Sequence, residues 1–175
     1  CIEAVQITAL ARQLNVTRGS FYWHFETRDD LLTALIEEWR ARNTGVMVEA
    51  IANVTSVDEG ILALFSVWVD HSRYDARLDQ SIRDWAQHSP DLRIIVKAED
   101  AARVDAIAAF FTRFDYPNPE AFIRARVIYF TQISYYALQV EQDEDLEERL
   151  SYLESYFRCF TGREMDPKTA DAYRE

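Results

Sequence analysis

Hydroxyl and guanidinium side chains gather where a short helix is expected to begin. The run consists of Thr17, Arg18, Gly19 and Ser20. Free backbone N–H groups at a helix start, beside hydroxyls and a glycine that leaves space, can dock a phosphate. The fork of an arginine at that position matches the O6 and N7 atoms of guanine. This run therefore predicts contacts with a nucleic-acid backbone and with base edges.

Two short predicted helices must hold this run in place. The first is indicated by apolar residues at helical spacing, namely Ile7, Leu10, Ala11 and Leu14. It should end near Asn15, because asparagine tolerates the left-handed backbone of a tight turn. Thr17 can cap a second helix, which should end near His24 or Phe25. Two short helices joined in this way form a helix-turn-helix, which presents its second helix to the major groove of DNA.

The aromatic residues of the second helix fall on different faces. Phe21 and Phe25 should face a core, and the Val16 side chain should pack into the same core from the turn. An alternative is a capped aromatic helix that merely packs into a bundle. That alternative leaves three neighbouring residues on the other faces unexplained, namely Tyr22, Trp23 and His24. We therefore favour DNA reading by the segment from about residue 6 to residue 35.

This stretch resembles the TetR family of repressors. Members carry the run Val-Ser/Thr-x-Gly-x-Phe/Leu-Tyr-x-His/Tyr-Phe. A small polar residue, a lysine or arginine, acidic residues and a pair of leucines follow this run. The matching positions are Val16, Thr17, Gly19, Phe21, Tyr22, His24, Phe25, Thr27, Arg28, Asp29, Asp30, Leu31 and Leu32. Leu10 and Ala11 match an Ile-Ala pair of the preceding helix.

The resemblance implies a DNA interface on the second helix and just after it. It implies phosphate contacts from Thr17, Tyr22, His24 and Arg28. It implies base-edge or groove contacts from Arg18, Ser20 and Trp23, beside the open helix start at Gly19. Family members carry another helix upstream, so we expect the DNA-binding head, residues 1–30, to lack its first helix here.

The charge distribution restricts DNA binding to this end of the chain. The 175 residues carry a net charge of −11, which argues against a protein that coats nucleic acid. Residues 1–28 hold three arginines and two glutamates, a net charge of +1, so the remaining chain carries −12. DNA should therefore meet the head, and the rest should face away from it.

The remaining chain predicts an all-α body, residues 31–175. Caps and apolar spacing indicate helices over about 27–52, from 56, around 78–85, and over 89–114, 118–140 and 145–160. Residues 166–175 read as a polar tail. Few glycines and prolines and no sustained alternation argue against strands. We expect a helical bundle for ligand sensing and dimerisation, as in the family.

An effector pocket is predicted where aromatic and polar residues cluster on successive helices of the body. The candidates are Phe65, Trp68, His71, Ile82, Arg83, Trp85, His88 and Tyr129. These aromatics could equally fill the core. The last two long helices resemble the pair that forms the dimer interface in the family. The candidates for that interface are Val127, Phe130, Ser134, Tyr152, Tyr156 and Phe160.

Other classes of protein are disfavoured. Asp84 and His88 lie one helical turn apart, but the paired Glu-x-x-His motifs of a di-metal bundle are missing, so we expect neither a metal nor a cofactor. No catalytic or nucleotide-binding motif occurs, so an enzyme is not expected. Two cysteines are too few for a disulfide framework. We find no membrane span and no signal peptide, and expect a cytoplasmic protein.

Two hypotheses follow. The first is a homodimeric transcriptional regulator, a repressor that a small organic effector releases from a palindromic operator. The alternative is a small-molecule-binding helical dimer that has lost specific DNA binding, motivated by the acidic body and the incomplete head. The effector, the operator, the target genes and the choice between repression and activation stay open.

Overall fold

The fold is all-helical over the residues described. The computed structural model describes residues 7–174, without the side chains of Ile7, Thr8, Arg18, Asp171 and Arg174. In that range no strand occurs, as the sequence predicts. The helices are α1 Ile7–Gln13, α2 Arg18–His24, α3 Arg28–Trp39, η2 Arg40–Gly45, α4 Val46–Ala52, α5 Val57–Val69, α6 Ala76–His88, α7 Pro90–Arg113, α8 Asn118–Ala137, η3 Val140–Gln142, α9 Leu146–Ser151, α10 Leu153–Thr161 and α11 Pro167–Arg174. The expected loss of a first helix concerns residues outside this range.

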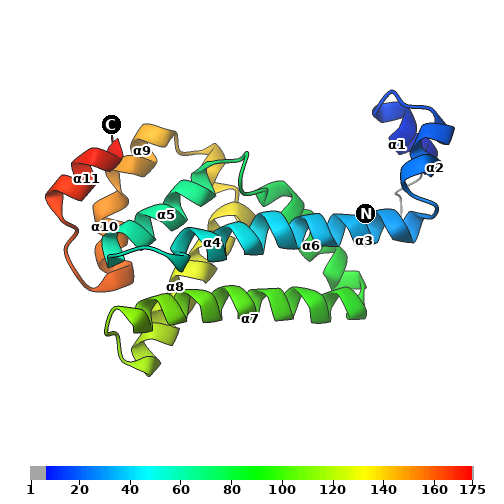
Figure 1. The fold of residues 1–175 in the computed structure, drawn as a ribbon. Coiled ribbons are helices and arrows are strands. Elements are labelled where there is room, and N and C mark those ends of the chain that lie inside the picture. Colours follow the sequence, from blue (N-terminus) through cyan, green and yellow to red (C-terminus); the bar gives the residue numbers. More distant parts are fainter. Residues whose placement is uncertain (1–6, 175) are drawn as a thin grey trace.

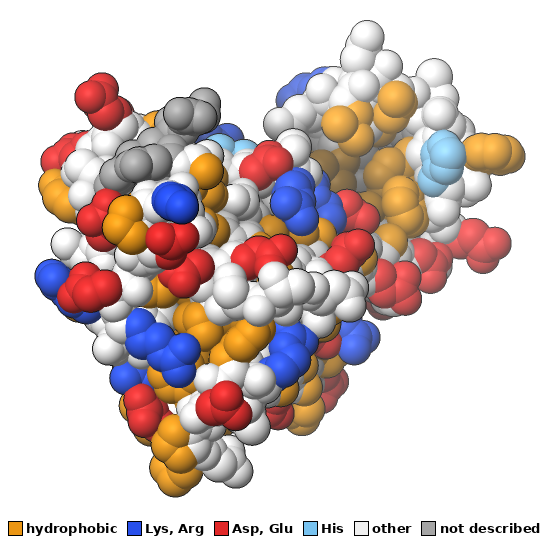
Figure 2. Space-filling view, turned by 60° about the vertical axis from the view of Figure 1, so that its left-hand side comes forward, with side chains coloured by type: hydrophobic (Ala, Val, Ile, Leu, Met, Phe, Trp, Pro, Cys, Tyr) orange, Lys and Arg blue, Asp and Glu red, His pale blue; other side chains and the backbone are white. Residues whose placement is uncertain are grey.

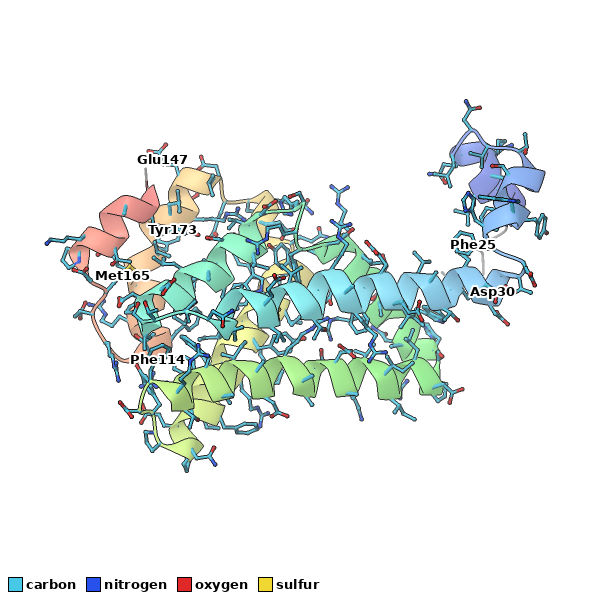
Figure 3. All side chains as sticks on the ribbon, in the orientation of Figure 1. Phe25, Asp30, Phe114, Glu147, Met165 and Tyr173 are labelled. Carbon is cyan, nitrogen blue, oxygen red and sulfur yellow. The ribbon has the colours of Figure 1, made fainter. Side chains whose placement is uncertain are left out.

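The head stands apart from the body. Figure 1 shows α1 and α2 at one end of α3, away from the other helices. From there α3, η2 and α4 run as one long rod into the body, where α7 lies alongside it and packs against α8. Phe25 and Asp30 mark the head end in Figure 3, whereas Met165 and Tyr173 lie at the opposite end of the molecule. The head is therefore attached to the body through one helix.

Helix starts follow the capping signals of the sequence. Thr27 Oγ1 accepts from the backbone N–H of Asp30 at 3.1 Å, and the Asp30 carboxylate accepts from the Thr27 N–H at 2.8 Å. This reciprocal capping box satisfies two helix-end donors at the start of α3. The hydroxyls of Ser56 and Ser89 accept from backbone N–H groups at the starts of α5 and α7, and Pro90 occupies the first position of α7.

The predicted helix over 27–52 contains a π-helical segment. Residues Arg40–Gly45 form η2, a wider turn than the α-helix on either side of it. This segment buries Asn43, whose side-chain amide donates to the carbonyl of Asp75 at 3.0 Å. A polar contact thus ties the middle of the rod to the start of α6.

Two predictions for the C-terminal region are wrong in detail. The helix expected over 145–160 is divided at Tyr152 into α9 and α10. The expected polar tail forms α11, because Pro167 favours a first helical turn and the Asp166 carboxylate accepts from Lys168 and Thr169. Ala170 of α11 is buried, so the segment packs onto the body. In the described part of the chain, no helix is long and apolar enough to cross a membrane.

A buried carboxylate lies where the rod meets α6 and α7. Asp79 on α6 is 1% exposed and accepts from the Trp39 indole at 2.7 Å. It also accepts from Arg83 at 2.7 Å and from Arg103 at 3.1 Å. Burial alone would raise the pKa of Asp79, but the two guanidinium groups and the indole N–H hold it below its ordinary value.

The same charge cluster extends to α8 and η2. The Tyr129 hydroxyl donates to Asp100 at 2.5 Å and accepts from Arg83 and Arg103 at 2.8 and 3.0 Å. Arg103, which is fully buried, also donates to the Thr44 hydroxyl at 2.9 Å and lies over the Trp39 ring. We call Trp39, Thr44, Asp79, Arg83, Asp100, Arg103 and Tyr129 the buried charge cluster. It fastens the head-bearing rod to three helices of the body.

Replacing Asp79 with asparagine should destabilise the protein strongly. Arg103 would keep its buried charge without its counter-charge, a change that lowers the free energy of unfolding by about 3–5 kcal/mol. Because the folded pKa of Asp79 is lowered, its contribution is complete above the unfolded-state pKa of about 3.9. It is lost as the pH falls through the folded pKa, so the two proteins should converge in acid.

Urea denaturation of the wild type and Asp79→Asn at neutral and acid pH measures this difference. Glu164→Gln is a matched control, because Glu164 forms an exposed pair with Arg158 at 3.5 Å and should matter little. Equal destabilisation by both substitutions would contradict the assignment.

Candidate DNA interface and ligand cavity

The capped start of α2 is open to solvent. Thr17 has an extended backbone, and its hydroxyl accepts from the Ser20 N–H at 3.0 Å. A Cβ added at Gly19 would meet nothing nearer than the Thr17 hydroxyl at 3.8 Å. The fold therefore does not need glycine at this position, and the helix start is left sterically open.

The outer side of α2 carries the predicted polar and aromatic residues. Trp23 is 83% exposed and meets the His24 ring edge-on at 4.8 Å between centroids. Ser20, Tyr22 and His24 are also exposed. Phe21 is buried and packs against the half-buried Phe25 at 5.5 Å. The two phenylalanines thus face inward as predicted, and the other aromatic side chains of α2 face water.

The turn between α1 and α2 is formed as expected but is not buried. Asn15 has φ 54°, the left-handed conformation predicted for it. Val16 donates its backbone N–H to Ala11, but its side chain is 41% exposed, so the prediction that it plugs into a core is wrong. Leu14 is 64% exposed. The physical reason is that, within residues 7–30, α1 and α2 pack mainly on each other and leave this side of the turn uncovered.

The two arginines that were predicted to contact DNA lie at the starts of helices. Arg28 is the first residue of α3, with a partly exposed side chain 4.0 Å from the Asp29 carboxylate. Arg18 is the first residue of α2, but its side chain lies outside the described part. Acidic side chains are spread over the visible face of the body in Figure 2, in keeping with its net charge.

The structure separates the predicted pocket residues. Arg83 and Tyr129 belong to the buried charge cluster. Ile82 is buried in a second core with Trp39, and Trp85 packs against that core. His71 and His88 are exposed. Phe65 and Trp68 line a cavity, in which the other six do not take part.

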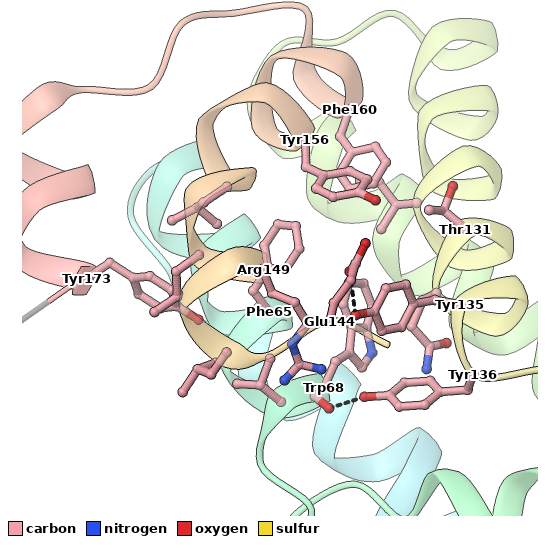
Figure 4. A pocket seen from close by; sticks show the side chains of 16 residues that line it. Phe65, Trp68, Thr131, Tyr135, Tyr136, Glu144, Arg149, Tyr156, Phe160 and Tyr173 are labelled. Carbon is pink, nitrogen blue, oxygen red and sulfur yellow. Dashed lines mark hydrogen bonds between the residues drawn. The ribbon is translucent and has the colours of Figure 1, made fainter. Parts of the chain in front are cut away.

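That cavity lies between α5, α8, α9, α10 and α11. The free space between these helices, counted together with the open mouth of the cavity, is about 720 Å³. Figure 4 shows aromatic side chains on several sides of it. Its lining residues are Phe65, Trp68, Val69, Ile128, Thr131, Gln132, Tyr135, Tyr136, Glu144, Leu146, Arg149, Leu150, Leu153, Tyr156, Phe160 and Tyr173.

Hydrogen bonds hold three of the cavity tyrosines. Tyr136 donates to the Trp68 carbonyl, and Tyr135 donates to the Glu144 carboxylate at 2.9 Å. Tyr173 of α11 accepts from the Ser66 hydroxyl at 3.2 Å. Burial raises the pKa of both Tyr135 and Tyr136 to about 12. Both hydroxyls therefore stay protonated at neutral pH.

This cavity was difficult to predict from the sequence. Its walls come from segments as distant as α5 and α11, and α11 was expected to be a polar tail. Tyr173 could have been recognised only by reading Asp166-Pro167 as a helix start, like Ser89-Pro90. Among the described residues, no group of three or more His, Cys, Asp or Glu side chains is placed to hold a metal ion.

The predicted dimer residues fall into two groups. Val127 and Phe130 of α8 are 47% and 45% exposed, and Ser134 and Tyr152 are also exposed. Tyr156 is half-buried and Phe160 is buried, and both line the cavity. Exposed Phe122 and Ile123 extend the apolar face of α8, which was not predicted. We call Phe122, Ile123, Val127 and Phe130 the α8 apolar face.

Comparisons with known proteins identify the head. Residues 2–35 match the family model described as bacterial regulatory proteins, tetR family. No curated protein sequence matches the chain significantly. The matched segment includes α1, α2 and the start of α3, where the capped, outward-facing helix lies. Residues 2–35 therefore carry the N-terminal helix-turn-helix DNA-binding domain of the tetR family of bacterial regulatory proteins, which implies a role in transcriptional regulation.

Proposed function

We propose that the protein is a dimeric repressor that leaves a palindromic operator when a small organic effector binds. The observation that carries the proposal is the outward face of α2, where an open, capped helix start adjoins exposed Tyr22, Trp23 and His24. Free N–H groups at this start suit a phosphate, and the exposed ring systems suit the walls of the major groove. Phosphate contacts then come from Thr17, Tyr22, His24 and Arg28, and groove contacts from Arg18, Ser20 and Trp23.

Dimerisation is supported by the α8 apolar face. Four large apolar side chains, each about two-fifths exposed or more, lie within three turns of one helix. Arg126 lies over the rings of both Phe122 and Phe130, 5.6 and 5.3 Å from their centroids, at the distance of a cation–π contact. A second copy packed against this face would bury it. Two heads could then read the two halves of a palindrome.

Control by an effector is supported by the cavity and by the way the head is attached. Both α5 and α8 line the cavity, and α8 also contributes Tyr129 to the buried charge cluster. That cluster fastens the rod that bears the head. An effector that prefers one arrangement of α8 can therefore bias the position of the head, by no more than its difference in affinity between the two arrangements.

Gly19→Ala should weaken DNA binding without weakening the fold. The added methyl group has space in the free protein, whereas a docked phosphate would occupy that space. Losing one charge-assisted contact reduces affinity by about tenfold or more. Gel retardation of DNA from upstream of the native gene measures this loss, with melting temperature as a check on folding.

Gly45→Ala is the matched control, because its Cβ would meet nothing nearer than 3.9 Å and Gly45 lies in the rod, away from the head. It should leave DNA affinity unchanged. If no promoter fragment were retarded by the native dimer, DNA reading would be refuted in favour of a ligand-binding dimer.

Arg18→Ala and Arg28→Ala should impair DNA binding in different ways. Loss of a base-edge contact at Arg18 should cost about 1–3 kcal/mol on the operator and relax the sequence preference. Loss of a phosphate contact at Arg28 should weaken binding to all DNA sequences alike. It should also make the slope of log affinity against log salt concentration less steep by about 1. Titrations of operator DNA and unrelated DNA at several salt concentrations distinguish the loss of a base-edge contact from the loss of a phosphate contact. Identical effects of both variants on both DNAs would contradict the assigned roles.

Val127→Glu should disrupt the dimer. A two-fold interface through α8 would bring two buried carboxylates together, and burying charge without a partner is unfavourable. Light scattering coupled to gel filtration measures the mass. Val48→Glu is the matched control, since Val48 is 40% exposed on α4 and lies off this face. A Val127→Glu protein that stayed dimeric would place the interface elsewhere.

A further inference from the structure

One end of the cavity is a wall of aromatic rings. The rings of Phe65 and Phe160 are nearly parallel, with centroids 6.2 Å apart, and Tyr156 lies 5.6 Å from Phe160. In Figure 4, Tyr156 and Phe160 lie at one end of the cavity, and Trp68 and Tyr136 lie toward the other. Aromatic rings bind other rings by stacked and edge-on contacts. This end of the cavity therefore suits a flat ring system.

The other end holds polar groups that have no partner. The indole N–H of Trp68 and both amide atoms of Gln132 are buried and make no hydrogen bond of good geometry. The Tyr74 hydroxyl lies near the Gln132 side chain, which opposes the rise in the pKa of Tyr74 caused by burial. Trp68 is 6% and Gln132 is 5% exposed, and both line the cavity. Buried polar groups are almost always paired, so these three atoms call for a partner from outside the chain. Two of them are donors, and the Gln132 oxygen is an acceptor.

The charges that line the cavity balance each other. Glu144 carries a negative charge and already accepts from Tyr135. Arg149 carries a positive charge, and its Nε is buried without a hydrogen-bond partner. With one charge of each sign, the lining carries no net charge. A neutral ligand avoids leaving either charge uncompensated.

We propose that this cavity binds a neutral aromatic carboxamide or lactam. The rings lie against Phe65, Tyr156 and Phe160. The ligand carbonyl accepts from the Trp68 indole and the Gln132 amide, and the ligand N–H donates to the Gln132 oxygen. A side-chain amide and a ligand amide can satisfy each other's donor and acceptor. This assignment rests on the proposed function, because it makes the cavity the effector site.

Calorimetry with three related probes tests the chemistry on the native protein without DNA. The probes are 2-naphthamide, 2-methylnaphthalene and 2-naphthoate, which share one ring system and differ in the polar group. We expect 2-naphthamide to bind about tenfold more tightly than either of the others, since it alone pairs the buried amide without adding a charge. Equal affinities for 2-naphthamide and 2-methylnaphthalene would overturn the proposal, and so would tighter binding of 2-naphthoate.

Gln132→Leu locates the interaction. The leucine keeps most of the volume but removes the amide, so 2-naphthamide should lose about tenfold in affinity while 2-methylnaphthalene loses none. Gln142→Leu, at an exposed glutamine outside the cavity, should change neither. Trp68→Phe provides a second variant, which removes the indole N–H and keeps a ring. Unchanged discrimination between the probes in both cavity variants would overturn the proposal.

Gel retardation with 2-naphthamide present distinguishes this inference from the proposed function. Binding that depends on Gln132 but leaves DNA affinity unchanged supports the assigned ligand chemistry and refutes the effector role of the cavity. A native protein that binds operator DNA but does not discriminate among the probes overturns the ligand chemistry and leaves DNA reading intact.

Discussion

The contact between Asp79 and Arg103 constrains the rest of the structure. Both side chains are almost fully removed from water, so neither can lose the other without leaving an uncompensated buried charge. Trp39 and Thr44 of the rod bind to this pair from one side, and Tyr129 of α8 binds from the other. Buried charges accept few alternative geometries, because each must keep its partners. A movement of α8 must therefore move the rod as well or break the cluster.

This constraint gives Arg83 and Tyr129 another role from the one expected. From the sequence, an arginine and a tyrosine among aromatic residues suggest a ligand pocket. In the structure both are engaged with Asp79, Asp100 and Arg103, and burial raises the pKa of Tyr129 above its ordinary range while the arginines oppose that shift. The cavity lies instead farther along α5 and α8 toward the C-terminal helices. The protein thus separates the polar groups that hold the rod from the groups that line the cavity.

What could be predicted from the sequence depended on local signals. The helix-turn-helix was predictable because Thr17, Thr27 and Asn15 act on backbone groups within three or four residues of themselves. Helix starts at Ser56 and Ser89 were predictable for the same reason. The matched family segment confirms the family prediction over that same region.

Contacts between distant segments could not be predicted in this way. The partners of Arg103, including the Trp39 ring, come from four other helical elements, and no periodicity in one helix reveals them. The cavity depends on α11, whose polar composition hid the buried Ala170 and the inward Tyr173. The residues expected at a dimer interface also fall into two groups that no pattern within one helix distinguishes. Tyr156 and Phe160 face the cavity, whereas Val127 and Phe130 face outward.

The π-helical segment of the rod sets the rotational phase of the head. An α-helix advances about 100° per residue, and a wider turn accommodates one additional residue without lengthening the rod by a full turn. The segment Arg40–Gly45 lies between the capping box of α3 and the body, where Asn43 and Thr44 are held by Asp75 and Arg103. Elsewhere in the rod, where regular α-helix cannot absorb a residue in this way, a one-residue insertion or deletion would turn α2 about the rod axis by about 100° while leaving every residue of the head unchanged. A change in rod length outside this segment would therefore present the same face of α2 in a different direction relative to the body.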